Sequence, residues 1–157
     1  MPPADRDDGS ETAVKLLAGI SEIVWGPHLY RGDSSILAQI GKRGLKMVSR
    51  LPGSIVISTG DRPEVELGVY AELVPGKHLE FCIDIRHDRE CWLIDTVVML
   101  DNWPEEEGMT TLRSFPTRRA ATIDECVEQL RAAAVDLASC IDVLDEPPVL
   151  AYLHKRS

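Results

Sequence analysis

Motifs that identify common enzyme and cofactor classes are missing from this chain of 157 residues. It has no phosphate-binding loop with P-loop spacing, no G-x-S-x-G nucleophile elbow and no H-E-x-x-H zinc motif. Its four cysteines form no C-x-x-C pair, and His87, Asp88 and Cys91 have no second pair to complete a tetrahedral zinc site. We therefore expect no catalytic residue set, no metal and no cofactor, and we favour a protein that is not an enzyme.

Positive charge is also scarce. Lys and Arg number 17 against 26 Asp and Glu, which gives a net charge of −9. Nucleic-acid binding needs a basic surface, so this balance argues against it and suits a basic protein partner. No hydrophobic run is long enough to cross a membrane, and the polar N-terminus has no apolar signal core. We expect a cytoplasmic protein with four reduced, packed cysteines.

The clearest element that is present is a helix over residues 122–144. Thr122 and Glu125 form a capping box at its start, and Pro147 prevents the helix from continuing beyond its end. Its apolar residues alternate in steps of four and three, which places them on one stripe. The stripe consists of Ile123, Val127, Leu130, Ala134, Leu137, Ile141 and Leu144.

Two further helices precede the strands. Residues 11–25 have helical apolar spacing after Ser10, a plausible N-cap, so residues 1–10 are expected to be a disordered tail and residues 11–157 a single domain. A short helix is expected from Ile36 to Ile40, capped by Asp33 or Ser34.

From Leu45 onwards the apolar period changes to two, which predicts strands. The expected strands are 45–51 and 54–59 around a Pro-Gly turn, then 65–74, 78–86, 92–99 and 109–115. A three-residue loop, Pro75–Lys77, would pair Ala71 with Phe81, and a turn at 87–90 would pair Ile85 with Trp92. Residues 149–153 form either a final turn or a short edge strand.

These elements predict an α+β fold. We expect a two-layer sandwich in which an antiparallel meander of about six strands is covered on one face by the N-terminal helix and the long C-terminal helix. The uncovered face would carry an apolar island, Tyr70, Leu93, Val97 and Met99, among carboxylates. Asp84 and Asp95 would lie diagonally across two strands. The alternative is that residues 149–153 fold over this face.

An apolar patch rimmed by one sign of charge is typical of a protein-binding site. The main hypothesis is a non-enzymatic module that binds a basic protein partner, in the manner of an inhibitor. In architecture and acidity the chain resembles small bacterial immunity proteins and secretion chaperones. The expected binding residues are Tyr70, Asp84, Asp95, Asp101, Trp103, Glu105, Glu106 and Glu107. Neutralising the three glutamates of this loop is expected to slow association in a salt-dependent way.

Two alternatives remain open. The first is a small-molecule binder or enzyme with a pocket between the sheet and the N-terminal segment, lined by Trp25, His28, Tyr30 and Trp92. The second is a homo-oligomeric chaperone or structural module, in which the uncovered face or an edge strand forms a homodimer.

Overall fold

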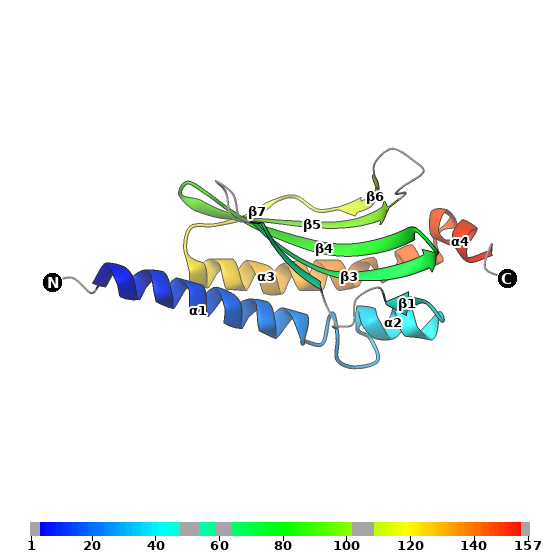
Figure 1. Ribbon diagram of the computed structural model, residues 1–157, viewed down its shortest axis with the longest axis horizontal. Helices are drawn as coiled ribbons and strands as arrows, with labels where there is room; N and C mark the ends of the chain where they lie inside the picture. Colours follow the sequence, from blue (N-terminus) through cyan, green and yellow to red (C-terminus); the bar gives the residue numbers. More distant parts are fainter. Residues whose placement is uncertain (1–3, 48–53, 59–63, 102–108, 155–157) are drawn as a thin grey trace.

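The computed structural model describes residues 4–47, 54–58, 64–101 and 109–154. It has two layers, an antiparallel sheet and a layer of helices beneath it, with helices α1 and α3 side by side (Figure 1). The predicted α+β two-layer sandwich is therefore confirmed. No helix in the described ranges is both long enough and apolar enough to cross a bilayer.

The elements follow one another in a simple order. The helices are α1 (Ala4–Val24), α2 (Ile36–Lys42), α3 (Ile123–Ala138), the 3-10 helix η1 (Ser139–Asp145) and α4 (Pro147–His154). The strands are β1 (Lys46–Met47), β2 (Ser54–Ser58), β3 (Glu64–Val74), β4 (Lys77–Asp88), β5 (Cys91–Asp101), β6 (Met109–Ser114) and β7 (Arg118–Ala120). Strands β3, β4 and β5 form the centre of the sheet, β1 and β2 both pair with β3, and β6 and β7 both pair with β5.

At the start of α3 the predicted cap by Thr122 is present, but Glu125 reaches back to the amide of Ala121 and not to that of Thr122. The Thr122 hydroxyl accepts from the Glu125 amide at 3.1 Å, and the Glu125 carboxylate accepts from the Ala121 amide at 2.9 Å. The prediction of one helix to Leu144 was wrong, because α3 ends at Ala138 and a 3-10 helix follows. There the Ser139 hydroxyl donates to the Asp136 carbonyl, and the tighter turn brings Leu137, Cys140 and Val143 to the core.

Other helix boundaries also differ from the sequence prediction. Helix α1 begins at Ala4, so Ser10 lies inside the helix and the prediction that it is the N-cap was wrong. The sequence supplies a reason, since aspartates fall in its first turns, where the helix dipole favours negative charge. Helix α2 is capped by Ser35, whose hydroxyl accepts from the Ala38 amide, and not by Asp33 or Ser34.

The register of the central hairpins required correction. The β3–β4 turn has two residues, Pro75 and Gly76, and an irregularity between Glu72 and Val74 shifts the pairing so that Ala71 lies opposite Leu79. In the β4–β5 hairpin, a two-residue turn with Arg89 at a φ of 55° places Ile85 opposite Ile94. Both predicted registers were wrong by two residues, a shift that leaves every side chain on its predicted face.

The edges of the sheet and the C-terminus differ more. Strands β1 and β2 both run antiparallel to β3 along one edge, so they are not the two arms of a hairpin. Strand β7 was not foreseen. Residues 147–154 form helix α4, which uses Pro147 in its first turn, a position that tolerates proline. Val149 of α4 is buried in the main core, so α4 closes the end of the sandwich (Figure 1) and the alternative in which it covers the other face of the sheet was wrong.

The main core lies between the sheet and the helix layer. Phe81, Ile83, Val98, Leu130 and Leu137 are fully buried there. Helices α1 and α3 approach each other closely, because Gly19 leaves room for Val127, whose side chain would lie 3.0 Å from a Cβ at Gly19. The sheet thus buries one face, and the candidate site lies on the other.

Candidate functional site

We define the back face as the side of the sheet that faces away from α1 and α3 (Figure 1). Among the described residues, no helix covers it. Strand pairing places the following residues on it: Glu64, Glu66, Gly68, Tyr70, Glu72, His78, Glu80, Cys82, Asp84, Arg86, Leu93, Asp95, Val97, Met99, Asp101 and Met109. The predicted site residues Tyr70, Asp84, Asp95 and Asp101 therefore share one surface.

Carboxylates outnumber cations on the described part of the back face, where Lys46 lies opposite Glu72 and Arg119 lies opposite Leu93. Arg86 Nη2 donates to Asp95 Oδ2 at 2.6 Å, and the Thr117 hydroxyl donates to the other oxygen of Asp95. Within the described residues, Glu66, Glu80 and Asp84 form no ion pair with a lysine or arginine. Of the described cations, Arg86 offsets part of the negative charge of Asp84.

Asp84 and Asp95 lie directly opposite each other on β4 and β5, closer than the diagonal placement expected from the sequence. Burial raises the pKa of Asp84 to about 6, and repulsion from Glu66, Glu64 and Asp95 adds to the effect, while Arg86 lowers it. Like charges opposite each other in a sheet are destabilising. This pair is thus a place where the fold keeps charge at a cost in stability.

A cluster of polar side chains lies next to this pair. Oxygens of Glu66 and Glu80 and the sulfur of Cys82 all lie within 4.8 Å of one another. Glu66 lies close enough to the Tyr70 hydroxyl and the Cys82 thiol to add to the rise in pKa that burial causes in both. The Tyr70 ring lies on Gly68, since a Cβ at that glycine would be 2.6 Å from its Cε1 atom. We call Glu66, Tyr70, Glu80, Cys82 and Asp101 the carboxyl network.

Protonation in the carboxyl network is shifted towards the neutral forms. Burial, followed by repulsion from Asp101 and Glu66, raises the pKa of Glu80 to about 7. Burial also raises the pKa of the Tyr70 hydroxyl and of the Cys82 thiol. A thiol with a raised pKa is a poor nucleophile and a poor zinc ligand. Three ligand atoms also fall short of a tetrahedral set, so we assign no metal to these residues.

Apolar side chains occupy the β5 and β6 side of the back face. Met109 is 53 % exposed, and Tyr70, Val97 and Met99 are half-buried. Leu93 is buried, yet it lies outside the main core. The predicted apolar island is thus partly covered. Met109 and Glu64 were not foreseen as members of this surface, because only the register of β6 with Asp101 and of β3 with Arg86 shows them to belong to it.

Half of the predicted binding residues belong to a segment that the structure does not describe. Trp103, Glu105, Glu106 and Glu107 are outside the described residues. Asp101, the last residue of β5, immediately precedes that segment and belongs to the carboxyl network.

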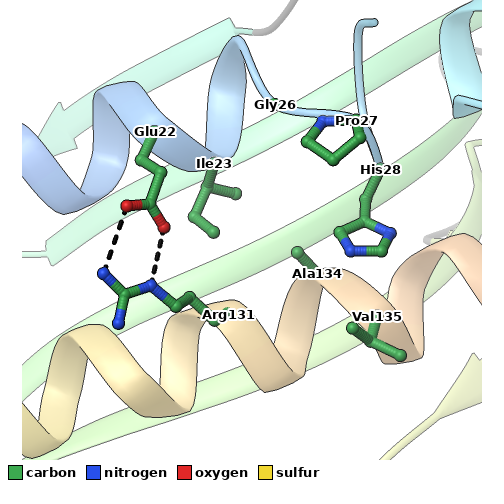
Figure 2. A pocket seen from close by; sticks show the side chains of 8 residues that line it. All are labelled: Glu22, Ile23, Gly26, Pro27, His28, Arg131, Ala134 and Val135. Atoms are coloured by element: carbon green, nitrogen blue, oxygen red, sulfur yellow. Dashed lines mark hydrogen bonds and ion pairs between the residues drawn. The ribbon is translucent and has the colours of Figure 1, made fainter. Parts of the chain in front are cut away.

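The four residues of the alternative pocket lie in three separate places in the structure. His28 lines a cavity of about 230 Å³ between the end of α1 and α3, beside the Glu22–Arg131 ion pair (Figure 2). Trp25 and Tyr30 instead contact each other edge to face at the surface, with ring centroids 5.2 Å apart.

The fourth predicted pocket residue lies with a different partner. Trp92 contacts His87 in the same edge-to-face manner, with ring centroids 4.7 Å apart. The cavity beside His28 does contain a carboxylate, but Arg131 lowers the pKa of Glu22. A raised carboxyl pKa, which acid–base chemistry would use, is therefore found on the back face and not at Glu22.

Compared with known protein families, curated proteins and solved structures, the chain matches none.

Proposed function

We propose that this chain is a non-enzymatic binding protein whose back face takes a basic protein partner. The observation that carries this proposal is a set of half-buried carboxylates, Glu66, Glu80 and Asp84, which form no ion pair with a described lysine or arginine and lie on a sheet face that no described helix covers. The raised pKa values of Glu80 and Asp84 express the repulsion within that set. A cation placed among them would relieve the repulsion and add attraction. Both effects would contribute to the free energy of binding.

The chemistry of the face favours a protein partner. Tyr70, Val97, Met99 and Met109 lie among the carboxylates, and an apolar centre with a charged rim is the usual composition of a protein interface. A net charge of −9 disfavours a nucleic-acid partner. Lysine and arginine side chains of a partner protein would contact both the apolar and the acidic part of the surface. Their apolar stems would pack on methionine and valine, and their charged ends would lie beside carboxylates.

The finer proposal is an inhibitor or immunity-type protein that acts in the cytoplasm. Its acidic face would occupy the basic active site of a partner such as a nuclease, where charge complementarity speeds association and supplies specificity. The four cysteines, all free, support a reducing compartment.

The test is capture of a partner from a lysate of the source cells at low and high salt. The back-face variant Glu66→Gln/Glu80→Gln/Asp84→Asn is compared with the helix-face variant Asp124→Asn/Glu128→Gln/Asp142→Asn, which removes the same charge from the opposite side. We expect a basic protein that the original chain and the helix-face variant retain at low salt and that the back-face variant loses. Retention by the back-face variant would contradict the proposal.

The cavity beside His28 is the observation that favours a second candidate function, binding of a small molecule. It combines apolar lining from Ile23, Ala134 and Val135 with an imidazole at its rim (Figure 2). A thermal-shift screen of metabolites would test it, with His28→Ala as the variant that should lose any stabilisation. The homo-oligomer alternative is tested by the mass of the protein in solution.

A further inference from the structure

We propose that two copies of this chain associate as a weak dimer through the outer side of helix α1, with the two α1 helices antiparallel. The outer side of α1 consists of Val14, Leu17, Ala18, Ser21 and Trp25, all of which are exposed. The back face of the sheet points away from α1 (Figure 1), so this contact leaves both back faces free for partners.

Helix α1 is apolar on two sides. Ile23 is buried in the main core, and at about 100° per residue Val14 and Leu17 lie on the other side of the helix, where they are 65 % and 62 % exposed. Trp25, which is 45 % exposed, continues this outer side, because its amide still donates to the Ser21 carbonyl at 3.0 Å. A surface helix normally has a polar outer side, so apolar side chains there indicate an interaction surface.

Exposed apolar side chains are concentrated on this side of the molecule. The described residues expose six large ones, which are Val14, Leu17, Trp25, Tyr30, Val135 and Met109. Three of the six belong to the outer side of α1, and Tyr30 contacts Trp25 edge to face, with ring centroids 5.2 Å apart, so it extends the same patch. Only Met109 belongs to the back face.

The spacing of the outer side fits a second copy of the same helix. Val14, Ala18, Ser21 and Trp25 follow one another in steps of four, three and four residues, an order that is the same from either end. An antiparallel second copy therefore places Val14 against Trp25 and Ala18 against Ser21. Large side chains meet at both ends of the contact and small ones in the middle, where packed helices come closest. A two-fold interface needs such self-complementarity, because the same surface belongs to both partners.

The charges beside the outer side also fit an antiparallel pair. Lys15 and Glu22 line the same hollow between α1 and α3, so they share one flank of α1. Antiparallel pairing centred between Ala18 and Ser21 brings Lys15 of one copy to within about 3 Å, measured along the helix axis, of Glu22 of the other. Parallel pairing would instead place like charges beside each other.

The size of the contact implies a weak dimer. The outer side is about 16 Å long and one helix wide, which belongs to the class of small interfaces that bury less than about 1,200 Å² in total. The charge of −9 on each copy adds a long-range repulsion that salt screens, so salt should strengthen the dimer. Binding of a basic partner to the back face should respond to salt in the opposite direction.

The first experiment is sedimentation equilibrium of the full chain at about 10–500 µM protein, a range suited to small interfaces, in about 50 mM and about 300 mM salt. We expect a dimer that grows with protein concentration and with salt. Leu17→Glu should weaken it at least about tenfold. Met109→Glu, the matched control on the back face, should stay within about twofold of the original chain.

Both substituted side chains are more than half exposed, so both variants should keep the fold, which circular dichroism verifies. A monomer at every concentration would overturn the inference and leave the proposed function in place. A dimer that Leu17→Glu does not weaken would overturn it as well.

The second experiment tests the orientation with a short bismaleimide cross-linker. In the antiparallel dimer the two copies of residue 21 lie about 4.5 Å apart along the helix axis, whereas the two copies of residue 14 lie about 16 Å apart. Ser21→Cys should therefore give cross-linked dimer above the level that the native cysteines of the original chain give, and Val14→Cys should give little more than that level. Equal cross-linking by both variants, or none by Ser21→Cys, would contradict the antiparallel contact.

Discussion

The two faces of the sheet are built from the same three central strands, yet their effects on the stability of the protein are opposite. On the face towards the helices, Phe81, Ile83 and Val98 are fully buried. On the back face, their immediate neighbours Glu80 and Asp84 are half-buried acids whose pKa values are raised, above all by burial. Because successive residues of a strand alternate between faces, one stretch of sequence can stabilise the fold and carry an unfavourable charge cluster at once. A face that lowers stability and that no described helix covers is a surface suited to function.

The largest expected effect is loss of packing on the helix side. Phe81→Ala should lower the free energy of unfolding by about 3–5 kcal/mol, because it leaves a cavity in the fully buried core. Val97→Ala, on the half-buried back face of the adjacent strand, should cost about 1 kcal/mol or less. Urea denaturation measures both. Equal costs for the two substitutions would remove the contrast between the faces.

A smaller effect, of opposite sign, is expected from the carboxyl network. Folding raises the pKa of Glu80 from its usual 4.5 to about 7, so this group favours the folded state at low pH and loses that contribution as the pH rises through about 7. Glu80→Gln should therefore stabilise the protein at about pH 8, by about 1 kcal/mol once screening by water at this half-exposed site is allowed for. At about pH 4 the gain should vanish. Denaturation curves at the two pH values give the comparison, and a variant that is less stable at the higher pH would contradict it.

The smallest change in stability is expected at Gly68, over which the half-buried Tyr70 ring lies. Gly68→Ala places a methyl group where the Tyr70 ring now lies, and the ring can swing outwards at a net cost of about 1 kcal/mol or less. The informative readout is the environment of Tyr70. Its hydroxyl should move away from Glu66, and the ring resonances should move towards those of an exposed tyrosine. An unchanged Tyr70 signal would show that the ring does not rest on Gly68.

The assignment of residues to faces could be predicted from the sequence, whereas the pairing of individual residues could not. Strict alternation identifies Val69, Ala71 and Phe81 as one face, and a register error of two residues leaves that assignment intact. The irregularity beside Leu73 and the left-handed Arg89 in the tight turn have no clear signal in the sequence, and they decide which residues meet.

This difference matters for the site. In the predicted register Cys82 lies opposite Asp95, whereas in the structure it lies opposite Val97, and Asp84 takes the place opposite Asp95. The acids of the back face could therefore be identified from the sequence, but their network could not. Similarly, the apolar stripe identifies the C-terminal helix, while the change to a 3-10 helix after Ala138 depends on how Cys140 and Val143 reach the core.

The most direct measurement is the association rate of the captured basic partner with the original chain and the two charge-matched variants, at about 50 mM and about 300 mM salt. If the back face is the docking surface, Glu66→Gln/Glu80→Gln/Asp84→Asn should slow association about tenfold or more at low salt and flatten its salt dependence. Asp124→Asn/Glu128→Gln/Asp142→Asn should stay within about twofold of the original chain. Equal slowing by both variants, or a larger effect of the helix-face variant, would contradict the assignment of function to the back face.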